Sequence, residues 1–328
     1  MQYITSRSPG TFPRLRFVFL DPERKRLRAL WRLLLHTLLL FVFGFVDVVI
    51  LQSFGSTPEW LFWPVFAVLV TLPATWIAAK WLDRREFAEL GFHLDRRWCL
   101  DLGFGLVLGA ALLAGVFLVE LEAGWLEIRA TKVVPEGYEG SFFVAMLGPA
   151  LLFIAVGFHE ELLSRGYHLR NMAEGVTWRG KIDGRAALLL GTLLSSALFG
   201  LLHADNPNAS ALSTFNVGLA GCFLALGLLL TGELAIPIGI HITWNFFQGN
   251  VFGFPVSGTN AGPRLYAIEQ AGDPLITGGQ FGPEAGLIGV AAMLTGCAAI
   301  LVWVKLTRGE LRIMRELVRP QAERRAQR

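Results

Sequence analysis

Long apolar stretches alternate with shorter polar stretches along most of the chain. A helix that crosses a lipid bilayer needs about 20 mostly apolar residues, and the apolar stretches are about that long. Hydropathy therefore predicts about eight membrane-spanning helices. The predicted spans are 30–54, 60–82, 100–122, 142–172, 186–203, 210–231, 235–254 and 284–306.

Composition supports the membrane assignment and excludes several classes of protein. Of the 328 residues, 53% are hydrophobic and only 17% are charged, whereas a soluble domain has about 25% charged residues. Too few polar residues are present to cover a soluble core, which excludes a soluble enzyme, a disordered protein and a nucleic-acid-binding protein. Three cysteines cannot form a disulfide framework. The predicted fold class is an all-α, polytopic integral membrane protein.

The polar stretches predict one transmembrane domain with two basic extensions. Residues 1–28 are expected to form a basic cytoplasmic arm and residues 307–328 a basic cytoplasmic tail, with a helical domain at 29–306 between them. The polar side chains that could carry chemistry lie in a core at about 142–254. Residues 255–283 contain many Gly and Pro residues and predict an extramembrane loop.

The positions of the basic residues predict the topology. Lys and Arg accumulate in the cytoplasmic segments of membrane proteins. The eight predicted spans place all but three of the 29 Lys and Arg residues on one side, so both termini are predicted to be cytoplasmic, in the plasma (inner) membrane if the chain is bacterial. The basic segments are then expected to contact anionic lipid headgroups, not nucleic acid. The three exceptions are Arg129, Lys132 and Arg264.

Two adjacent glutamates interrupt the fourth apolar stretch. Ionisable side chains cost about 3 kcal/mol each inside a bilayer, which makes them candidates for function. Glu161 and Arg165 are four residues apart and can pair on one helix face. Glu160 lies about 100° around the helix and stays free to act as a general base. The alternative is that both glutamates belong to a salt-bridged helix end.

Three further polar side chains occur in later apolar stretches. His203 ends the stretch that begins near residue 186, and taken alone it could be an interfacial histidine. His241 and Asn245 are four residues apart and project from one helix face. Two neutral donors on one face suit an oxyanion hole, or a metal site completed from elsewhere. The alternative is hydrogen bonding between neighbouring helices.

In this order on membrane helices, these groups resemble the CPBP family of CAAX proteases and bacteriocin-processing enzymes. This family is also called the Abi family and is related to type II CAAX prenyl endopeptidases. The resemblance covers about residues 85–255. Each pattern alone is weak, but the ordered set of three is fairly specific. The patterns are Glu-Glu-x-x-x-Arg at Glu160, Glu161 and Arg165, Phe-x-x-x-His at Phe199 and His203, and His-x-x-x-Asn at His241 and Asn245.

The resemblance implies a role for each matching residue. Glu160 would be the general base that activates water, with assistance from His203. His241 and Asn245 would stabilise the tetrahedral oxyanion. The supporting pair, Glu161 and Arg165, would be structural or would help to place the substrate.

The need for a metal stays open at this point. The family has been described as metal-dependent, and Glu160, His203 and His241 could hold a divalent metal such as zinc, with water as the fourth ligand. The same residues could also work without a metal. The zinc motif His-Glu-x-x-His begins at His159 but fails because Leu163 stands where its second histidine is needed.

These observations predict an intramembrane endopeptidase that hydrolyses a peptide bond near a membrane-embedded or lipidated substrate terminus. Its expected partners are membrane lipids and a peptide or lipidated protein substrate. A non-catalytic immunity or scaffold protein with the same fold is the alternative. A transporter is disfavoured because the sequence contains no internal repeat.

Overall fold

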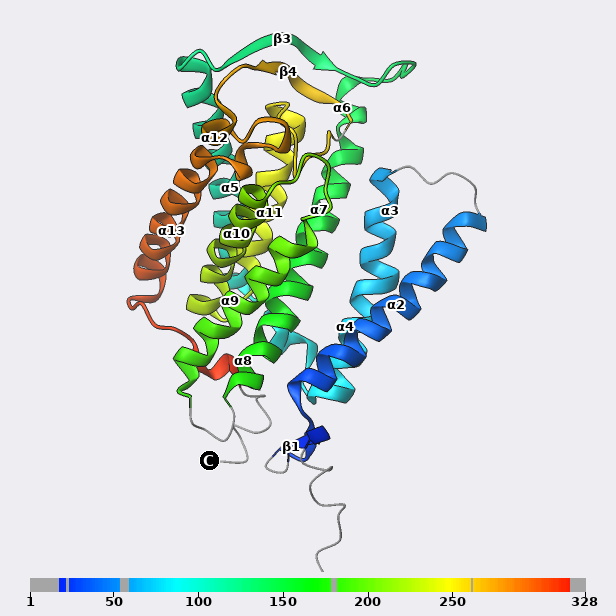
Figure 1. Cartoon of the computed structure of the whole chain (residues 1–328), viewed down its shortest axis with the longest axis vertical. Coiled ribbons are helices and arrows are strands. Elements are labelled where there is room, and N and C mark those ends of the chain that lie inside the picture. The colour runs from blue at the N-terminus through cyan, green and yellow to red at the C-terminus, as the bar shows by residue number, and fades with distance from the viewer. Residues whose placement is uncertain (1–17, 22–23, 54–58, 178–181, 261, 319–328) are drawn as a thin grey trace, which may run out of the picture.

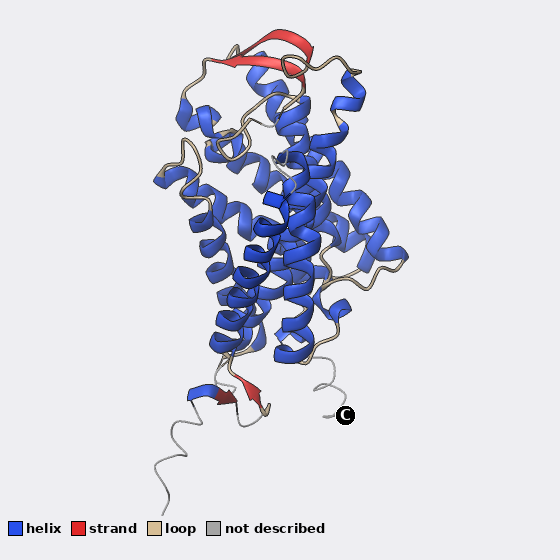
Figure 2. Ribbon diagram, turned by 90° about the vertical axis from the view of Figure 1, so that its right-hand side faces the viewer, coloured by secondary structure: helices blue, strands red, loops and turns tan. Residues whose placement is uncertain are grey.

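The structure is a computed structural model in which nearly all regular structure is helical (Figures 1 and 2). It confirms the predicted fold class, an all-α membrane protein. Most of the predicted arm at 1–28 and the second half of the predicted tail at 307–328 lie outside the described residues. The structure describes residues 18–21, 24–53, 59–177, 182–260 and 262–318.

Seven helices within the described residues are long and apolar enough to cross a membrane. Five of them are single helices, and two are composites in which α-helical and π-helical segments (η) follow one another without a break. The single helices are α2 (Ala29–Ser53), α5 (Arg96–Glu122), α9 (Gly184–Leu202), α10 (Ala211–Thr231) and α13 (Leu287–Arg308). The composites are α3 (Glu59–Phe66), η1 (Ala67–Thr71), α4 (Leu72–Ile77) and η2 (Ala78–Asp83), and α6 (Phe142–Ala145), α7 (Leu147–Glu161), η4 (Leu162–Leu169) and α8 (Arg170–Val176).

The eighth predicted segment, 235–254, differs from the other seven. It is helical over α11 (Ala235–Phe246) and η6 (Phe247–Val251), but it is shorter than each of the seven and is not among them. Most residues in the first half of α11 are buried, because α5, α7 and α10 surround this helix. The prediction of about eight spans is therefore close, and the eighth segment is a core helix of the bundle.

The two ends of the bundle carry different small elements (Figures 1 and 2). At one end, β3 and β4 form an antiparallel pair in which Thr131 lies opposite Tyr266. The two-residue strands β1 and β2 pair at the other end. The remaining elements within the described residues are the short α-helix α12 and four 3-10 helices, which also carry the letter η: η3, η7, η8 and η9. Bounds are β1 (Leu20–Asp21), β2 (Arg26–Leu27), β3 (Leu126–Val133), β4 (Arg264–Gln270), η3 (Phe87–Leu90), α12 (Pro274–Thr277), η7 (Gly279–Phe281), η8 (Pro283–Ala285) and η9 (Arg315–Val318).

Close packing of α5 against α11 fixes the depth of α11 in the bundle. A Cβ atom added to Gly105 of α5 would lie 2.5 Å from the carbonyl oxygen of Ile236, and one added to Gly239 of α11 would lie 2.6 Å from that of Leu102. Small residues let helix backbones approach in this way in membrane proteins. The largest hydrophobic core cluster lies around this contact and includes Leu113, Phe223, Ile240 and Ile300.

The outer faces of the helices are apolar, in contrast to those of a soluble protein. On α2, Phe41 and Phe45 are 73% and 72% exposed, and on α13 Leu306 is 78% exposed. Apolar patches of this kind are rare on soluble monomers. They match the lipid contact expected of membrane helices.

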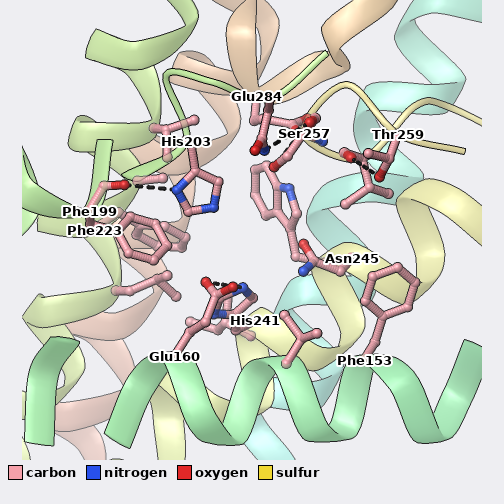
Figure 3. Close-up of a pocket in the computed structure, with 18 of the residues that line it drawn as sticks. Phe153, Glu160, Phe199, His203, Phe223, His241, Asn245, Ser257, Thr259 and Glu284 are labelled. Carbon is pink, nitrogen blue, oxygen red and sulfur yellow. Dashed lines mark hydrogen bonds and ion pairs between the residues drawn. The ribbon is translucent and has the colours of Figure 1, made fainter. Parts of the chain in front are cut away.

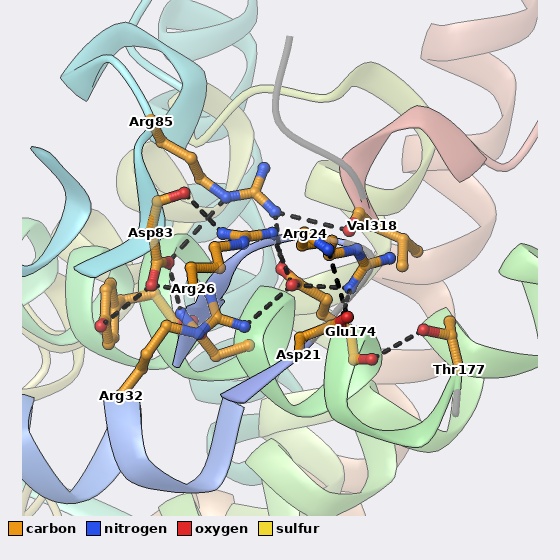
Figure 4. A network of polar contacts seen from close by, with 11 residues as sticks. Asp21, Arg24, Arg26, Arg32, Asp83, Arg85, Glu174, Thr177 and Val318 are labelled. Carbon is orange, nitrogen blue, oxygen red and sulfur yellow. Dashed lines mark hydrogen bonds and ion pairs between the residues drawn. The ribbon is translucent and has the colours of Figure 1, made fainter. Parts of the chain in front are cut away.

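A buried ionic network joins α2 to the rest of the bundle at the β1–β2 end (Figure 4). Arg32 of α2 pairs with Asp83 at 2.7 Å and with Glu174 of α8 at 2.9 Å. Arg26 and Arg85 also pair with Glu174, at 2.6 Å and 3.2 Å. All five residues are less than 6% exposed. Pairing is required at such a site because an isolated buried charge is very unfavourable.

Candidate active site

A cavity of about 230 Å³ lies inside the bundle (Figure 3). Four predicted site residues line it, although they come from three different helices: Glu160, His203, His241 and Asn245. Most of the other lining side chains are apolar, among them Leu152, Phe223 and Trp244. A water molecule occupies about 30 Å³ in the liquid, so the cavity has room for several waters or for a short stretch of substrate.

The two adjacent glutamates of α7 have different surroundings. Glu161 is fully buried, and its Oε1 accepts a hydrogen bond of 2.8 Å from Arg165, the pair that the four-residue spacing predicts. Glu160 instead faces the cavity (Figure 3), and its buried Oε2 has no hydrogen-bond partner. Each glutamate thus has one buried oxygen without a hydrogen-bond partner, but Glu161 pairs with Arg165 whereas Glu160 lines the cavity.

His241 lies between the two glutamates. Its Nδ1 is 2.8 Å from Oε1 of Glu161, and its Nε2 is 3.8 Å from Oε2 of Glu160. The sequence did not predict the contact with Glu161, because the rotation of α11 relative to α7 decides it. Since Glu161 accepts from Arg165 and also lies next to Nδ1, it holds the imidazole ring with Nε2 directed toward Glu160.

His203 ends α9 on the opposite side of the cavity (Figure 3). Its Nδ1 lies 2.8 Å from the backbone oxygen of Phe199. A carbonyl oxygen can only accept, so Nδ1 carries the proton, and Nε2 of the neutral ring is an acceptor. The ring lies across the cavity from Glu160, with no hydrogen bond between the two side chains. Its placement on the cavity wall differs from that of an isolated interfacial histidine.

Phe199 links the first two sequence patterns. The guanidinium carbon of Arg165 lies 4.3 Å from the centre of the Phe199 ring, a distance suited to a cation–π contact. The same ring lies 4.7 Å from that of His203 and 6.4 Å from that of His241. One phenylalanine therefore contacts the pair behind the site and both histidines.

Asn245 completes the predicted set. It lies one helical turn after His241 on α11, and its side chain enters the cavity beyond that histidine (Figure 3). The four-residue spacing places both side chains on one face of α11, as the sequence predicted.

The structure also adds lining residues that the sequence patterns missed. Trp63 belongs to α3, and its ring stacks on His159 with a centroid distance of 5.2 Å and an interplanar angle of 7°. Ser257, Thr259 and Glu284 cover the cavity from the other side. The signal that could have identified Glu284 is an acidic residue just before the last apolar stretch, but no periodicity connects it to the other site residues.

The three possible metal ligands, Glu160, His203 and His241, line the same cavity but do not form one close group. No group of three or more His, Cys, Asp and Glu side chains within the described ranges is close enough to hold a metal ion. Glu160 and His241 approach each other, whereas His203 lies across the cavity. Glu160 and His241 thus form one close pair, and His203 stands apart from it.

Comparison with known proteins identifies one family. The model of the Rce1-like family, described as type II CAAX prenyl endopeptidase Rce1-like, matches residues 142–247. Neither the curated proteins nor the solved structures contain a match. The matched region runs from α6 to the first residue of η6 and includes Glu160, Phe199, His203 and His241. Over this region, which is less than half of the chain, the sequence is similar to the Rce1-like family of type II CAAX prenyl endopeptidases.

Proposed function

We propose that this chain is an intramembrane endopeptidase in which Glu160 activates the water that hydrolyses a peptide bond. The observation that carries the proposal is the position of the Glu160 carboxylate. The Glu160 side chain lines the cavity, and its buried Oε2, which has no hydrogen-bond partner, lies 3.8 Å from Nε2 of His241. Membrane helices seldom contain such a group unless it functions.

The gap between Glu160 and His241 suits a water molecule. A distance of 3.8 Å is too long for a direct hydrogen bond, but a water about 2.8 Å from each atom fits this separation. Glu160 would accept one proton of that water. Nε2 of His203, an acceptor in the neutral ring, would face the attacking side and help to orient the water.

His241 and Asn245 would stabilise the negative charge that develops on the substrate oxygen. Nδ1 of His241 faces Glu161, and its Nε2 would donate a hydrogen bond to the developing oxyanion. The Asn245 amide is a second donor on the same helix face. Two donors directed at an oxyanion typically contribute several kcal/mol to catalysis.

The proposed reaction needs only water and the substrate. The water oxygen bonds to the carbonyl carbon while Glu160 takes the proton, which forms a tetrahedral intermediate. The carbon–nitrogen bond then breaks, and Glu160 returns the proton to the leaving amine. The products are a carboxylic acid and an amine, and the glutamate is regenerated.

The lining of the cavity favours an apolar substrate segment. Leu152, Phe223 and Trp244 offer no charged partner, so a membrane-embedded or lipidated terminus would bury its apolar part against them. Prenylated C-terminal peptides, which the family description names, are the first substrate class to test. Leader peptides and termini of membrane proteins are the second.

The test is peptide cleavage by the purified protein in detergent. Glu160→Gln keeps the shape of the side chain and removes the base, so kcat should fall by about 10²- to 10⁴-fold. Glu136→Gln, in an exposed loop, is the matched control and should cleave like the wild type. Equal cleavage by wild type and Glu160→Gln would reject the proposed base.

The same variant distinguishes the non-catalytic alternative. An immunity or scaffold protein would keep its cellular phenotype in Glu160→Gln, provided that expression and thermal stability are unchanged. A protease would lose it.

Chelation tests whether the reaction uses a metal. Because His203 lies apart from the close pair of Glu160 and His241, we expect cleavage to survive dialysis against EDTA. Loss of activity on dialysis, with recovery on addition of zinc, would instead support zinc held by Glu160, His203 and His241.

A further inference from the structure

One wall of the cavity, here called the roof, is formed by the turn at 255–260. A buried carboxylate outside the residues matched by the family model contacts this roof. Glu284 is 6% exposed and belongs to η8, just before α13 begins at Leu287. Its Oε1 accepts a hydrogen bond of 2.6 Å from the backbone N–H of Ser257, and its Oε2 accepts from the side-chain amide of Gln248. A buried carboxylate remains stable in such a place only if donors satisfy it.

The bond from Ser257 connects Glu284 to the turn that follows His203. The carbonyl oxygen of Ser257 accepts a hydrogen bond of 3.1 Å from Asn206, three residues after His203. The next residue, Gly258, has a φ of 83°, and a Cβ atom there would lie 1.8 Å from the carbonyl oxygen of Pro207. The roof turn therefore fits closely against the turn that follows His203.

The bond from Gln248 connects Glu284 to the helix that carries Asn245. Gln248 lies three residues after Asn245, in η6, and its side-chain amide also donates to the carbonyl oxygen of Pro255 at 2.5 Å. The amide nitrogen thus binds both Glu284 and the start of the roof. Its other atom, Oε1, is buried and has no hydrogen-bond partner.

We propose that Glu284 is a positioning residue that joins the two sides of the active site. Through Ser257 it holds the turn beside His203, and through Gln248 it holds the helix that carries His241 and Asn245. The inference rests on the proposed function of the cavity. Glu284 lies outside the residues matched by the family model. In this proposal it helps to set the distance between the two donors, His241 and Asn245, and the base, Glu160.

Replacement by alanine and by glutamine should have different effects. Glu284→Ala removes both hydrogen bonds and releases the roof. Glu284→Gln can keep both contacts, because its carbonyl oxygen accepts from Ser257 while its amide donates to the unpartnered Oε1 of Gln248 after that side chain turns over. This turn breaks the bond from Gln248 to Pro255, so the rescue is expected to be incomplete. Rescue by glutamine separates a role in hydrogen bonding from a role that requires the charge.

The experiment measures hydrogen–deuterium exchange of residues 255–260 in detergent, together with the cleavage kinetics. Loss of hydrogen bonds to a buried carboxylate should raise exchange of this segment about tenfold in Glu284→Ala. We expect kcat to fall about tenfold while KM changes less than about twofold, because the reacting groups and not the apolar wall are displaced. Glu284→Gln should stay within about threefold of the wild type in both measurements.

Two further variants complete the design. Gln248→Leu removes the bond to Glu284 together with the bond to Pro255 and leaves the bond from Ser257 to Glu284. It should raise exchange of the roof even if Glu284→Ala does not fold. Glu269→Gln, on the exposed face of β4 with a side chain that is 65% exposed, is the matched control and should change neither quantity. Unchanged exchange in folded Glu284→Ala and Gln248→Leu would overturn the inference. If the wild type cleaves no peptide, the proposed function fails, while the exchange data still decide whether Glu284 holds the roof.

Discussion

At the scale of single residues, hydrogen bonds give the two active-site histidines different chemistry. His203 donates from Nδ1 to a backbone carbonyl, so Nε2 of its neutral ring accepts. His241 faces carboxylates at both nitrogens, Glu161 at Nδ1 and Glu160 at Nε2. The partners of the two rings thus differ: a backbone carbonyl for His203, the proposed helper of the base, and carboxylates for His241, the proposed oxyanion donor.

Glu284 leads to a prediction about pH and stability. Burial raises the pKa of Glu284 from the ordinary value of 4.5 to about 7. The folded protein keeps this proton up to about pH 7, whereas the unfolded chain loses it near pH 4.5. The contribution to stability is therefore largest below about pH 4.5 and is lost as the pH rises to about 7, by about 3 kcal/mol in all.

The measurement is the unfolding temperature in detergent between pH 5 and pH 8. Glu284→Gln cannot titrate, so the difference between wild type and variant should change with pH up to about pH 7 and then level off. Parallel curves for the two proteins would contradict the prediction.

At the scale of elements, the active site depends on how closely two helices approach. α11 carries His241 and Asn245, and its depth in the bundle follows from the contact between Gly105 and the backbone near Ile236. The π-helical segment η4 directly follows Glu161, and such segments often occur at functional sites. Helix–helix contacts, not local propensity, thus align the three patterns.

Two glycines of α5 test this contact. Gly105→Ala forces a Cβ atom to within 2.5 Å of the carbonyl oxygen of Ile236, whereas Gly103 has no atom within 4 Å of that position. We expect Gly105→Ala to lower stability by about 1–3 kcal/mol and to reduce cleavage because α11 shifts. Gly103→Ala should be neutral or slightly stabilising, since alanine favours helix. Thermal unfolding of both variants checks the prediction, which fails if they behave alike.

At the scale of the whole molecule, α2 and the segment α3 to η2 attach to the bundle in two ways. At the β1–β2 end, Asp83 and Glu174 hold a group of arginines in the buried network of Figure 4. Further along the bundle, Trp63 of α3 reaches the cavity and stacks on His159. A helix outside the matched region, α3, therefore contributes to the candidate active site.

The network predicts a large effect of a single substitution. Glu174→Gln leaves several buried arginines with one carboxylate fewer, and breaking a buried pair costs about 3–5 kcal/mol. We expect the unfolding temperature in detergent to fall by about 5–10 °C. The matched control is Glu310→Gln, whose side chain is 69% exposed beside Arg312, and it should change little. An unchanged unfolding temperature in Glu174→Gln would show that the network does not stabilise the attachment of α2.

Much of the architecture could be predicted because membrane helices are local objects. Their length and apolar character are read from consecutive residues, and the pair of Glu161 and Arg165 follows from the helical repeat alone. The exception, α11, has the hydropathy of a span. Its shorter length and its burial by three neighbouring helices emerge only in the structure.

The sequence by itself determined the membrane class, most of the helices and the side chains that would be costly to bury without a role. Only the tertiary structure decided that His241 lies between Glu160 and Glu161, that Trp63 lines the cavity and that Glu284 holds its roof. The physical reason is range. Hydropathy and helical spacing act within about 20 residues. The three contacts instead join segments about 80 or more residues apart, or depend on a loop that has no repeat. These contacts therefore follow from the rotation and depth of the packed helices.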